Sequence, residues 1–470
     1  MPIMNSLWQQ FTLSNLPLSQ WRGGSYLYKL VGLLQTWRQG SWLLQWAEPI
    51  GALILATVFA LAPFVSNALL GLLLIACGAF WVLLTLSDHT GAAKGASPQI
   101  TPIHLLVLLY WAINVAATAL SPVKLAAREG LVKLTLYLLF FTLLAKVLRS
   151  PRLRSWIIGI FLHTSLIVSV YGLRQYIFGD ADALATWVDP TSDSAGLIRV
   201  YSYLGNPNLL AGYLIPAVSL SFAAIFNWQR WLPKALAITM FVVNSVCLVL
   251  TYSRGGWIGF LACIFVFLVL LVYWYSVQLP PKWRPWAMPA MLVSSATVVL
   301  LAILFVEPIR DRVASIFVGR EDSSNNFRIN VWSAVIEMIR DRPIYGIGPG
   351  NDAFNKIYPL YQRPRFTALS AYSIFLEIAV ETGFIGLLCF LWLLAVTFNQ
   401  GMEQLKRLRE IGNAQGFWLI AAIAAASGML AHGLVDTVWY RPQVITLWWL
   451  MVGIIASFYV PSARISGTSE

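Results

Sequence analysis

Residues 67–86 read NALLGLLLIACGAFWVLLTL and contain no charged side chain. An α-helix rises about 1.5 Å per residue, so about 20 mainly apolar residues cross the roughly 30 Å hydrocarbon core of a bilayer. A stretch of this length and composition therefore predicts a transmembrane helix. Runs of the same kind recur along the chain, so the fold is decided by the repetition of this pattern and not by a single anchor.

The composition of the whole chain agrees with a membrane-embedded fold. Of the 470 residues, 58% are hydrophobic and only 11% are charged, and the mean hydropathy is +0.70. These values lie outside the range of ordinary soluble domains. We therefore predict an all-α polytopic membrane protein with about twelve transmembrane helices. The predicted spans are 49–65, 67–86, 102–120, 130–148, 156–173, 209–226, 235–251, 256–277, 287–306, 374–398, 416–435 and 444–460.

The basic residues indicate how the chain is oriented. The formal net charge is +12, and Lys and Arg lie between the apolar spans, where such residues set orientation and contact lipid head groups. If both termini are cytoplasmic, the cytoplasmic segments hold roughly twice as many Lys and Arg as the short outer connections. We expect a multi-pass protein of the inner membrane with both termini in the cytoplasm. Its expected partners include membrane lipids and exclude nucleic acid.

The spans divide the chain into a few parts. Residues 1–48 are expected to form a cytoplasmic segment at the membrane surface, because Trp recurs along it and is enriched at membrane interfaces. Residues 49–460 would form one transmembrane domain, and residues 461–470 a cytoplasmic tail. Residues 307–371 are too polar to span the membrane and too long for a simple connection. We predict a long extracytoplasmic loop here, with a helix over residues 326–342.

No pattern in the sequence predicts a cofactor or a metal site. The cysteines lie within apolar runs, without metal-ligand spacing; they are Cys77, Cys247, Cys263 and Cys389. The glycine-rich residues 343–350 resemble a dinucleotide-binding loop only superficially, since no strand precedes them, and a turn that ends a helix is the better interpretation. His432 and Asp436 share one helical face but lack a third ligand, so we interpret them as a hydrogen-bonded pair.

Arg254 is the most informative charged residue. It follows Ser253 and precedes Gly255 at the boundary of a predicted span, which leaves its guanidinium group and nearby backbone N–H groups open to an anion. Further arginines lie on the same predicted side: Arg310, Arg312, Arg328, Arg340, Arg342, Arg363 and Arg365. Together they predict an outward-facing anion site. The alternative is that these arginines contact lipid phosphates or pair with Asp311, Asp322 and Asp341.

Two further groups of polar residues are candidates for a site. Glu377 and Glu381 are one helical turn apart, so their carboxylates face the same way, and carboxylates at membrane depth need a partner. They would act as a proton or cation relay or as a general base, or they would pair with an arginine such as Arg254. Asn206 and Asn208 lie at a capped helix start on the outer side, where they would also reach a polar substrate.

These segments together resemble the superfamily of O-antigen ligases and polymerases. The motifs that carry the resemblance are Gly205-Asn206-Pro207-Asn208, Ser253-Arg254-Gly255, the helix Arg328 to Trp332 with the following Gly346-Ile347-Gly348, and Leu376-Glu377 leading to Glu381-Thr382-Gly383. They cover roughly residues 201–459. Within the superfamily, the chain looks most like the cyanobacterial IctB type, which is named for bicarbonate transport.

The resemblance implies transfer of a glycan from undecaprenyl diphosphate to an acceptor sugar outside the membrane, without a metal. The family's diphosphate-holding arginines correspond to Arg254 and Arg328. Its base is a histidine followed by asparagine, and these positions hold Tyr372 and Ser373 here. The base would then be Glu377, Glu381 or Tyr372, and the ordinary tyrosine pKa near 10 suits that role poorly.

Two functions remain open at this point. The loss of the histidine with retention of the arginines favours an anion-handling protein, and the IctB resemblance implies that the anion is bicarbonate. The chain would then be a transporter or an accessory factor for inorganic carbon accumulation. The alternative is a glycan ligase or polymerase with a substituted base, whose ligand is a lipid-linked diphosphate glycan. Neither function requires a cofactor.

Overall fold

The structure is a computed structural model of the chain, and it describes residues 2–14, 33–87, 100–179, 198–317 and 319–460. In these ranges the regular structure is helical, without a β-strand. Eleven helices are long and apolar enough to cross a membrane, and α19 (Pro442–Ser457) is a shorter apolar helix. The predicted all-α polytopic membrane fold is confirmed.

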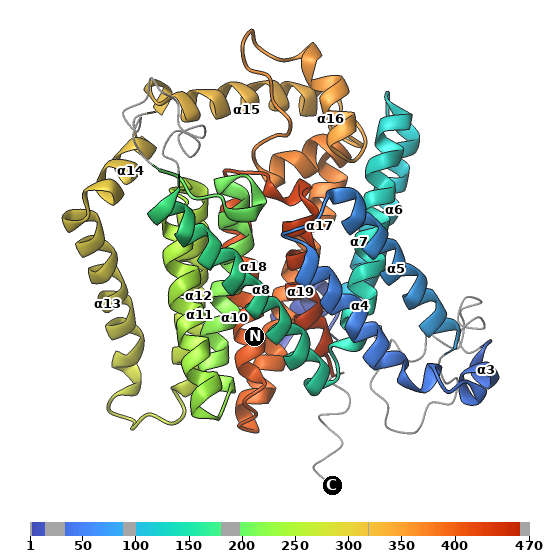
Figure 1. Ribbon diagram of the computed structural model, residues 1–470. Helices are drawn as coiled ribbons and strands as arrows, with labels where there is room; N and C mark the ends of the chain where they lie inside the picture. The colour runs from blue at the N-terminus through green and yellow to red at the C-terminus, as the bar shows by residue number, and fades with distance from the viewer. Residues whose placement is uncertain (1, 15–32, 88–99, 180–197, 318, 461–470) are drawn as a thin grey trace.

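Among the described residues, the bundle consists of the eleven long apolar helices and α19, whose arrangement Figure 1 shows. They are α4 (Ala47–Leu61), α5 (Asn67–Leu86), α6 (Pro102–Leu120), α7 (Lys124–Val147), α8 (Pro151–Phe178), α10 (Pro207–Asn227), α11 (Trp231–Val249), α12 (Arg254–Tyr275), α13 (Arg284–Phe305), α17 (Ile374–Glu410), α18 (Gly416–Gly433) and α19. Residues 67–86 and 102–120 are helical over the predicted bounds. Others run further: α7 includes the charged turn 124–129, α8 extends five residues beyond each end of the predicted 156–173, and α17 continues twelve residues past the predicted 398.

Three helices of the predicted loop cover one end of the bundle (Figure 1). They are α14 (Glu307–Phe317), α15 (Ser323–Asp341) and α16 (Asn351–Ile357). We call this end the loop face and the other end the opposite face. The predicted loop helix is therefore present as α15, and it starts three residues earlier because Asp322 caps it, accepting a 2.8 Å hydrogen bond from the Asn325 backbone N–H.

The centre of the bundle is built on close contact between helices rich in small residues. In α10 and α18, 83% of the membrane-crossing window is buried. A Cβ atom on Gly259 of α12 would lie 2.7 Å from the carbonyl oxygen of Gly428, and one on Gly428 of α18 would lie 2.6 Å from the carbonyl oxygen of Gly259. Glycine at both positions lets the two backbones touch, which is how helices in lipid obtain packing contacts.

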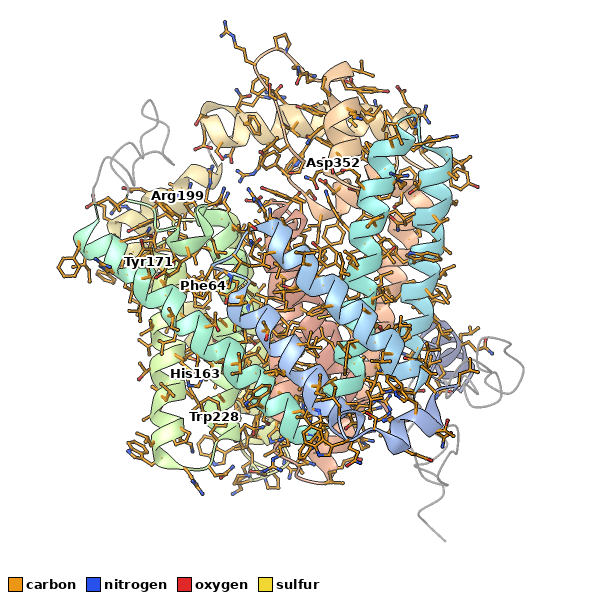
Figure 2. The ribbon with its side chains drawn as sticks, turned by 45° about the vertical axis from the view of Figure 1, so that its right-hand side comes forward. Phe64, His163, Tyr171, Arg199, Trp228 and Asp352 are labelled. Carbon is orange, nitrogen blue, oxygen red and sulfur yellow. The ribbon has the colours of Figure 1, made fainter. Side chains whose placement is uncertain are left out.

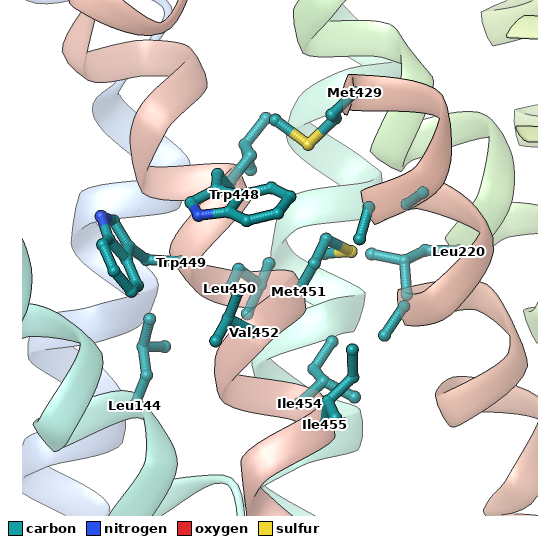
Figure 3. Close-up of a cluster of buried hydrophobic side chains, with 14 of the residues drawn as sticks. Leu144, Leu220, Met429, Trp448, Trp449, Leu450, Met451, Val452, Ile454 and Ile455 are labelled. Carbon is teal, nitrogen blue, oxygen red and sulfur yellow. The ribbon is translucent and has the colours of Figure 1, made fainter. Parts of the chain in front are cut away.

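Toward the opposite face, the core around α19 is mainly apolar. Figure 3 shows the side chains of α19 packed with those of neighbouring helices in this layer; among them are Leu144, Leu220, Leu450, Met451, Ile454 and Ile455. By contrast, α13 stands at the edge of the bundle in Figure 1 and has no buried residue. Its exposed surface fits contact with lipid.

The glycine-rich segment after α15 is attached to a kink in α17. Gly383 has a φ of +68°, which interrupts the helix and frees two carbonyl groups before it. The backbone N–H of Ile347 donates to the carbonyl of Val380, and that of Gly348 to the carbonyl of Glu381, each at 2.9 Å. The segment is thus more than the predicted turn at a helix end, because it completes the hydrogen bonding of a broken helix.

The two ends of the chain were predicted to be cytoplasmic. Residues 461–470 lie outside the described residues. At the other end, α1 (Pro2–Phe11) lies along α17: the indole N–H of Trp8 donates to Asn399 at 3.0 Å, and that of Trp392 donates to the carbonyl of Phe11 at 2.7 Å. The membrane side of both ends stays a prediction, as do the boundaries of the three parts of the chain.

The kink in α17 predicts that Gly383→Ala strongly destabilises the protein. A Cβ atom there would lie 2.2 Å from the carbonyl oxygen of Ile344, and a left-handed backbone costs an L-residue about 1–2 kcal/mol before an overpacking cost of about 1–3 kcal/mol. We expect the midpoint of thermal unfolding in detergent to fall and residues 343–350 to become accessible to protease. Gly71→Ala is the matched control, since nothing lies within 4 Å of its Cβ position. An unchanged midpoint for Gly383→Ala would contradict the account of the kink.

Candidate functional site

The C-terminal end of α18 lies at the loop face and organises the polar residues there. His432, in its last turn, is only 1% exposed and fits a slot bounded by glycines. A Cβ atom on Gly255 would lie 2.9 Å from its Cδ2 atom, one on Gly212 3.3 Å from its Nδ1 atom, and one on Gly259 2.9 Å from its Cβ atom. The predicted supporting residues Gly255 and His432 are therefore in contact.

Arg254 begins α12 beside this slot. Ser253 caps the helix, because its hydroxyl oxygen accepts a hydrogen bond from the Gly256 N–H at 3.1 Å. The guanidinium group of Arg254 donates to the Asp322 carboxylate at 2.8 Å, and both side chains are largely buried, with exposures of 7% and 12%. Arg254 thus connects the start of α12 to the start of α15, as expected if loop arginines pair with loop carboxylates.

Arg328 reaches the same region from α15. Its Nε donates to the carbonyl of Val435 at 2.9 Å, and its Nη1 donates to the hydroxyl of Ser324 at 2.7 Å. Its Nη2 lies 3.9 Å from a carboxylate oxygen of Asp436, a long ionic contact. Arg328 therefore contacts the turn after α18, residues 434–437, directly. His432, in the last helical turn before it, packs against the glycines of α10 and α12. The structure gathers Arg254 and Arg328 around the start of α15 and the end of α18.

The predicted hydrogen-bonded pair of His432 and Asp436 is wrong. Neither ring nitrogen of His432 has a hydrogen-bond partner, whereas Asp436 accepts from the Thr437 N–H at 2.8 Å and faces Arg328. The turn that ends α18 sends the two side chains to different neighbours. In the part of the chain that the structure describes, no group of three His, Cys, Asp or Glu side chains is arranged to hold a metal.

The two asparagines at the start of α10 have local partners. The side-chain oxygen of Asn206 accepts from the N–H groups of Asn208 and Leu209 at 2.8 and 3.2 Å, so the predicted helix cap is present. The side-chain oxygen of Asn208 accepts from Arg199 at 2.9 Å, and Arg199 also donates to the carbonyl of Thr251. Sequence reasoning missed Arg199, which links α10 to the turn before Arg254. Figure 2 shows Arg199 toward the loop face.

The carboxylates of α17 do not pair with an arginine, which corrects one of their predicted roles. Glu377 accepts from the backbone N–H of Ala371 at 2.6 Å, and Glu381 accepts from the N–H of Gly350 at 2.7 Å. Each carboxylate therefore fixes a piece of the loop to α17. The second oxygen of Glu377, Oε1, is buried without a hydrogen-bond partner, which leaves it available to a ligand.

Both carboxylates line a cavity of about 330 Å³ between α6, α7, α17 and α19. At its mouth, Lys133 of α7 pairs with Asp352 of α16 at 2.8 Å, and Figure 2 shows Asp352 at the loop face. The wall is rich in aromatic residues: Tyr110, Tyr137, Phe390, Trp439, Tyr440, Trp448 and Trp449. An apolar pocket with a few convergent polar groups is the usual form of a small-ligand site.

The cavity and the arginines meet at the turn after α18. Asp436 faces Arg328, and its neighbour Thr437 lines the cavity together with Glu377. The turn 434–437 therefore has the guanidinium group of Arg328 on one side and the carboxylate of Glu377 on the other. Thr437 was not predicted, because nothing in its sequence context distinguishes it from an ordinary loop residue.

Tyr372 is the residue that the resemblance aligns with a histidine. It has a positive φ of 50°, and its ring lies edge-on to Phe327 of α15, with centroids 5.3 Å apart. Burial, followed by the negative charge of Asp436, raises the pKa of Tyr372 to about 12. The phenol therefore stays protonated at neutral pH, so it is suited to donating a hydrogen bond and not to accepting a proton.

With this geometry established, similarity to known proteins becomes informative. Residues 239–391 match the family model of the O-antigen ligase. The matched region begins within α11, ends within α17 and includes Arg254, Arg328, Tyr372, Glu377 and Glu381. A search of the curated proteins finds no match. The match supports the resemblance to the O-antigen ligase-like superfamily, and it supports a lipid-linked glycan as the ligand class more than bicarbonate.

The protonation of Tyr372 predicts a pH effect on stability. Its pKa in the folded protein is above the unfolded value near 10, so its stabilising contribution is complete below pH 10 and is lost as the pH rises toward about 12. We expect Tyr372→Phe to reduce the fall in unfolding temperature between pH 10 and 12, measured in detergent. The exposed Tyr345→Phe is the control. If the wild type and Tyr372→Phe lose stability in parallel, the buried phenol is not responsible.

Proposed function

We propose that the chain transfers a glycan from a polyprenyl diphosphate donor to an acceptor hydroxyl at the loop face. The observation that carries this proposal is the gathering of Arg254 and Arg328, from distant parts of the sequence, around one turn beside a cavity. Both arginines lie in the region that matches the O-antigen ligase model. Guanidinium groups are well suited to phosphate because they present several N–H donors in a rigid plane.

In the proposed reaction, the acceptor hydroxyl attacks the anomeric carbon of the donor sugar. The new bond joins the acceptor oxygen to that carbon, and the bond from the carbon to the diphosphate oxygen breaks. The polyprenyl diphosphate leaves with the electron pair, and the acceptor proton passes to a base. Arginine contacts to the leaving diphosphate would stabilise the charge that develops on it.

We assign the base to Glu377. Glu377 lines the cavity. Its Oε1 atom is buried without a hydrogen-bond partner, while its Oε2 atom accepts from the Ala371 N–H. The raised pKa of Tyr372, about 12, argues against its acting as the base, and in this proposal it donates a hydrogen bond to the substrate. An acid–base group must lie within hydrogen-bond reach of the proton it accepts, which places the acceptor hydroxyl in the cavity.

The packing below the cavity favours this function over transport. Trp448 and Trp449 line the cavity, and beneath them apolar side chains of α19 pack against those of neighbouring helices (Figure 3). An ion pathway requires polar or hydrated groups through the bilayer. A cavity that opens at one face and ends on apolar packing suits a reaction between two membrane-bound substrates. The bicarbonate function stays a prediction that no observation favours.

The arginine site predicts loss of activity in Arg328→Gln. The protein in liposomes would receive a polyprenyl diphosphate-linked labelled sugar and candidate acceptors, and glycan transfer would be measured. Removing one preorganised donor from a developing charge lowers kcat by about 10²- to 10³-fold. Arg340→Gln is the control, because Arg340 lies on the same helix α15 but is exposed. Full activity of Arg328→Gln would refute the proposed diphosphate site.

The ion pair between Arg254 and Asp322 predicts that Asp322→Asn binds the donor more tightly. A diphosphate must compete with the Asp322 carboxylate for Arg254, and asparagine removes that charge while it preserves the helix cap. We expect the donor to bind about tenfold more tightly, equivalent to about 1.4 kcal/mol, which would be measured as a lower KM for the donor. Asp311→Asn, at an exposed carboxylate of α14, should leave KM unchanged. A weaker donor affinity in Asp322→Asn would show that Asp322 does not compete with substrate.

A further inference from the structure

A second basic cavity lies at the opposite face, away from the proposed site. It has a volume of about 400 Å³ and is formed where α7, α17 and α19 end and where α8 and α18 begin. Three arginines line it: Arg149, Arg154 and Arg407. No carboxylate contributes to its wall among the residues that the structure describes. The charged side chains in the described wall are thus basic.

Arg154 is a buried side chain of this cavity whose position is fixed by hydrogen bonds. It is only 2% exposed, and its side chain is held in one position by neutral acceptors. Its Nη1 donates to the carbonyl of Leu148 at 2.9 Å and to the hydroxyl of Ser457 at 3.3 Å, and its Nη2 donates to the side-chain oxygen of Gln415 at 2.7 Å. The guanidinium group also lies over the ring of Phe458, 3.9 Å from its centroid.

These contacts orient Arg154 but do not neutralise it. A carbonyl, a hydroxyl and an amide carry only partial charges, and a buried cation normally requires a counter-ion. The Nε atoms of Arg154 and of the half-buried Arg407 are buried without a hydrogen-bond partner, while Arg407 donates through Nη2 to the carbonyl of Phe458 at 3.2 Å. The cavity thus combines the charge of Arg154, whose hydrogen-bond partners are neutral, with unused donors of Arg154 and Arg407.

We propose that this cavity binds a phosphate group at the membrane boundary. Guanidinium groups match phosphate geometry, and the N-terminal ends of α8 and α18, two helices of 28 and 18 residues, add the positive end of the helix dipole. The cavity lies at the ends of four helices that are long enough to cross a membrane and of the shorter α19, where phospholipid head groups would lie. The phosphate belongs either to an anionic phospholipid or to a soluble phosphate, and both present the same oxygens to the arginines.

Occupation of this cavity would stabilise the junction of the bundle at the opposite face. Arg154 already connects the end of α7 to the end of α19 and to the start of α18. A phosphate bound between Arg154 and Arg407 would add α17 to this junction. The proposal is independent of the glycan transfer proposed for the loop face, because it concerns different residues and a different ligand.

The test is a binding measurement on the purified full chain. Two arms separate the phosphate sources: delipidated protein in detergent receives inorganic phosphate, and protein in nanodiscs of phosphatidylcholine receives increasing phosphatidylglycerol. Binding is read from the unfolding temperature and from native mass spectrometry of retained lipid. We expect binding in at least one arm. In the double variant Arg149→Gln/Arg407→Gln, the dissociation constant should be at least tenfold larger. This variant keeps the buried Arg154 and its hydrogen bonds.

Arg409→Gln is the matched control. Arg409 lies on the same end of α17 and also stacks on an aromatic ring, that of Tyr273 at 3.8 Å, but it lines a different cavity. The Arg409→Gln variant should bind phosphate or phosphatidylglycerol with the same dissociation constant as the wild type. The proposal is overturned if neither source binds, or if the double variant binds as tightly as the wild type. It is also overturned if Arg409→Gln weakens binding as much as the double variant, since general surface charge would then explain the affinity.

Discussion

The backbone contact between Gly259 of α12 and Gly428 of α18 is the constraint on which the loop-face site depends. In lipid, helix association relies on close packing, and here each glycine lies against the carbonyl group of the other. One turn further along, the same approach brings His432 against Gly255. The distance and rotation of the two helices are thereby set, and with them the position of Arg254 relative to the turn that follows α18.

The loop is held to this framework by backbone groups as well as by charges. The kink at Gly383 frees carbonyl groups that the segment after α15 satisfies, and Glu377 and Glu381 fix two further loop amides. Arg254 and Arg328 hold the start of α15. A long polar segment is therefore held over the bundle by hydrogen bonds and ion pairs to its helices.

The arginines at the two faces of the bundle have different partners. At the loop face, Arg254 is paired with Asp322, and Arg328 faces Asp436 at a longer distance, so a ligand enters by competition with carboxylates. At the opposite face, Arg154 is bonded to neutral groups only, so a phosphate adds to the site without displacing an anion. Under the two proposals, the site at the loop face would exchange its ligand and the site at the opposite face would stay occupied.

The sequence by itself determined the helices, because lipid admits a long uncharged run such as residues 67–86 in essentially one conformation. It also identified Arg254 and the cap at Asn206. It misassigned the partners of Glu377 and His432, since each depends on which backbone atoms a distant segment brings near. The cavity, the pairing of Arg254 with Asp322, and the role of Thr437 were decided only by tertiary structure. Contacts between residues far apart in the chain leave no periodic pattern in the sequence, whereas the solvent preference of each helix does.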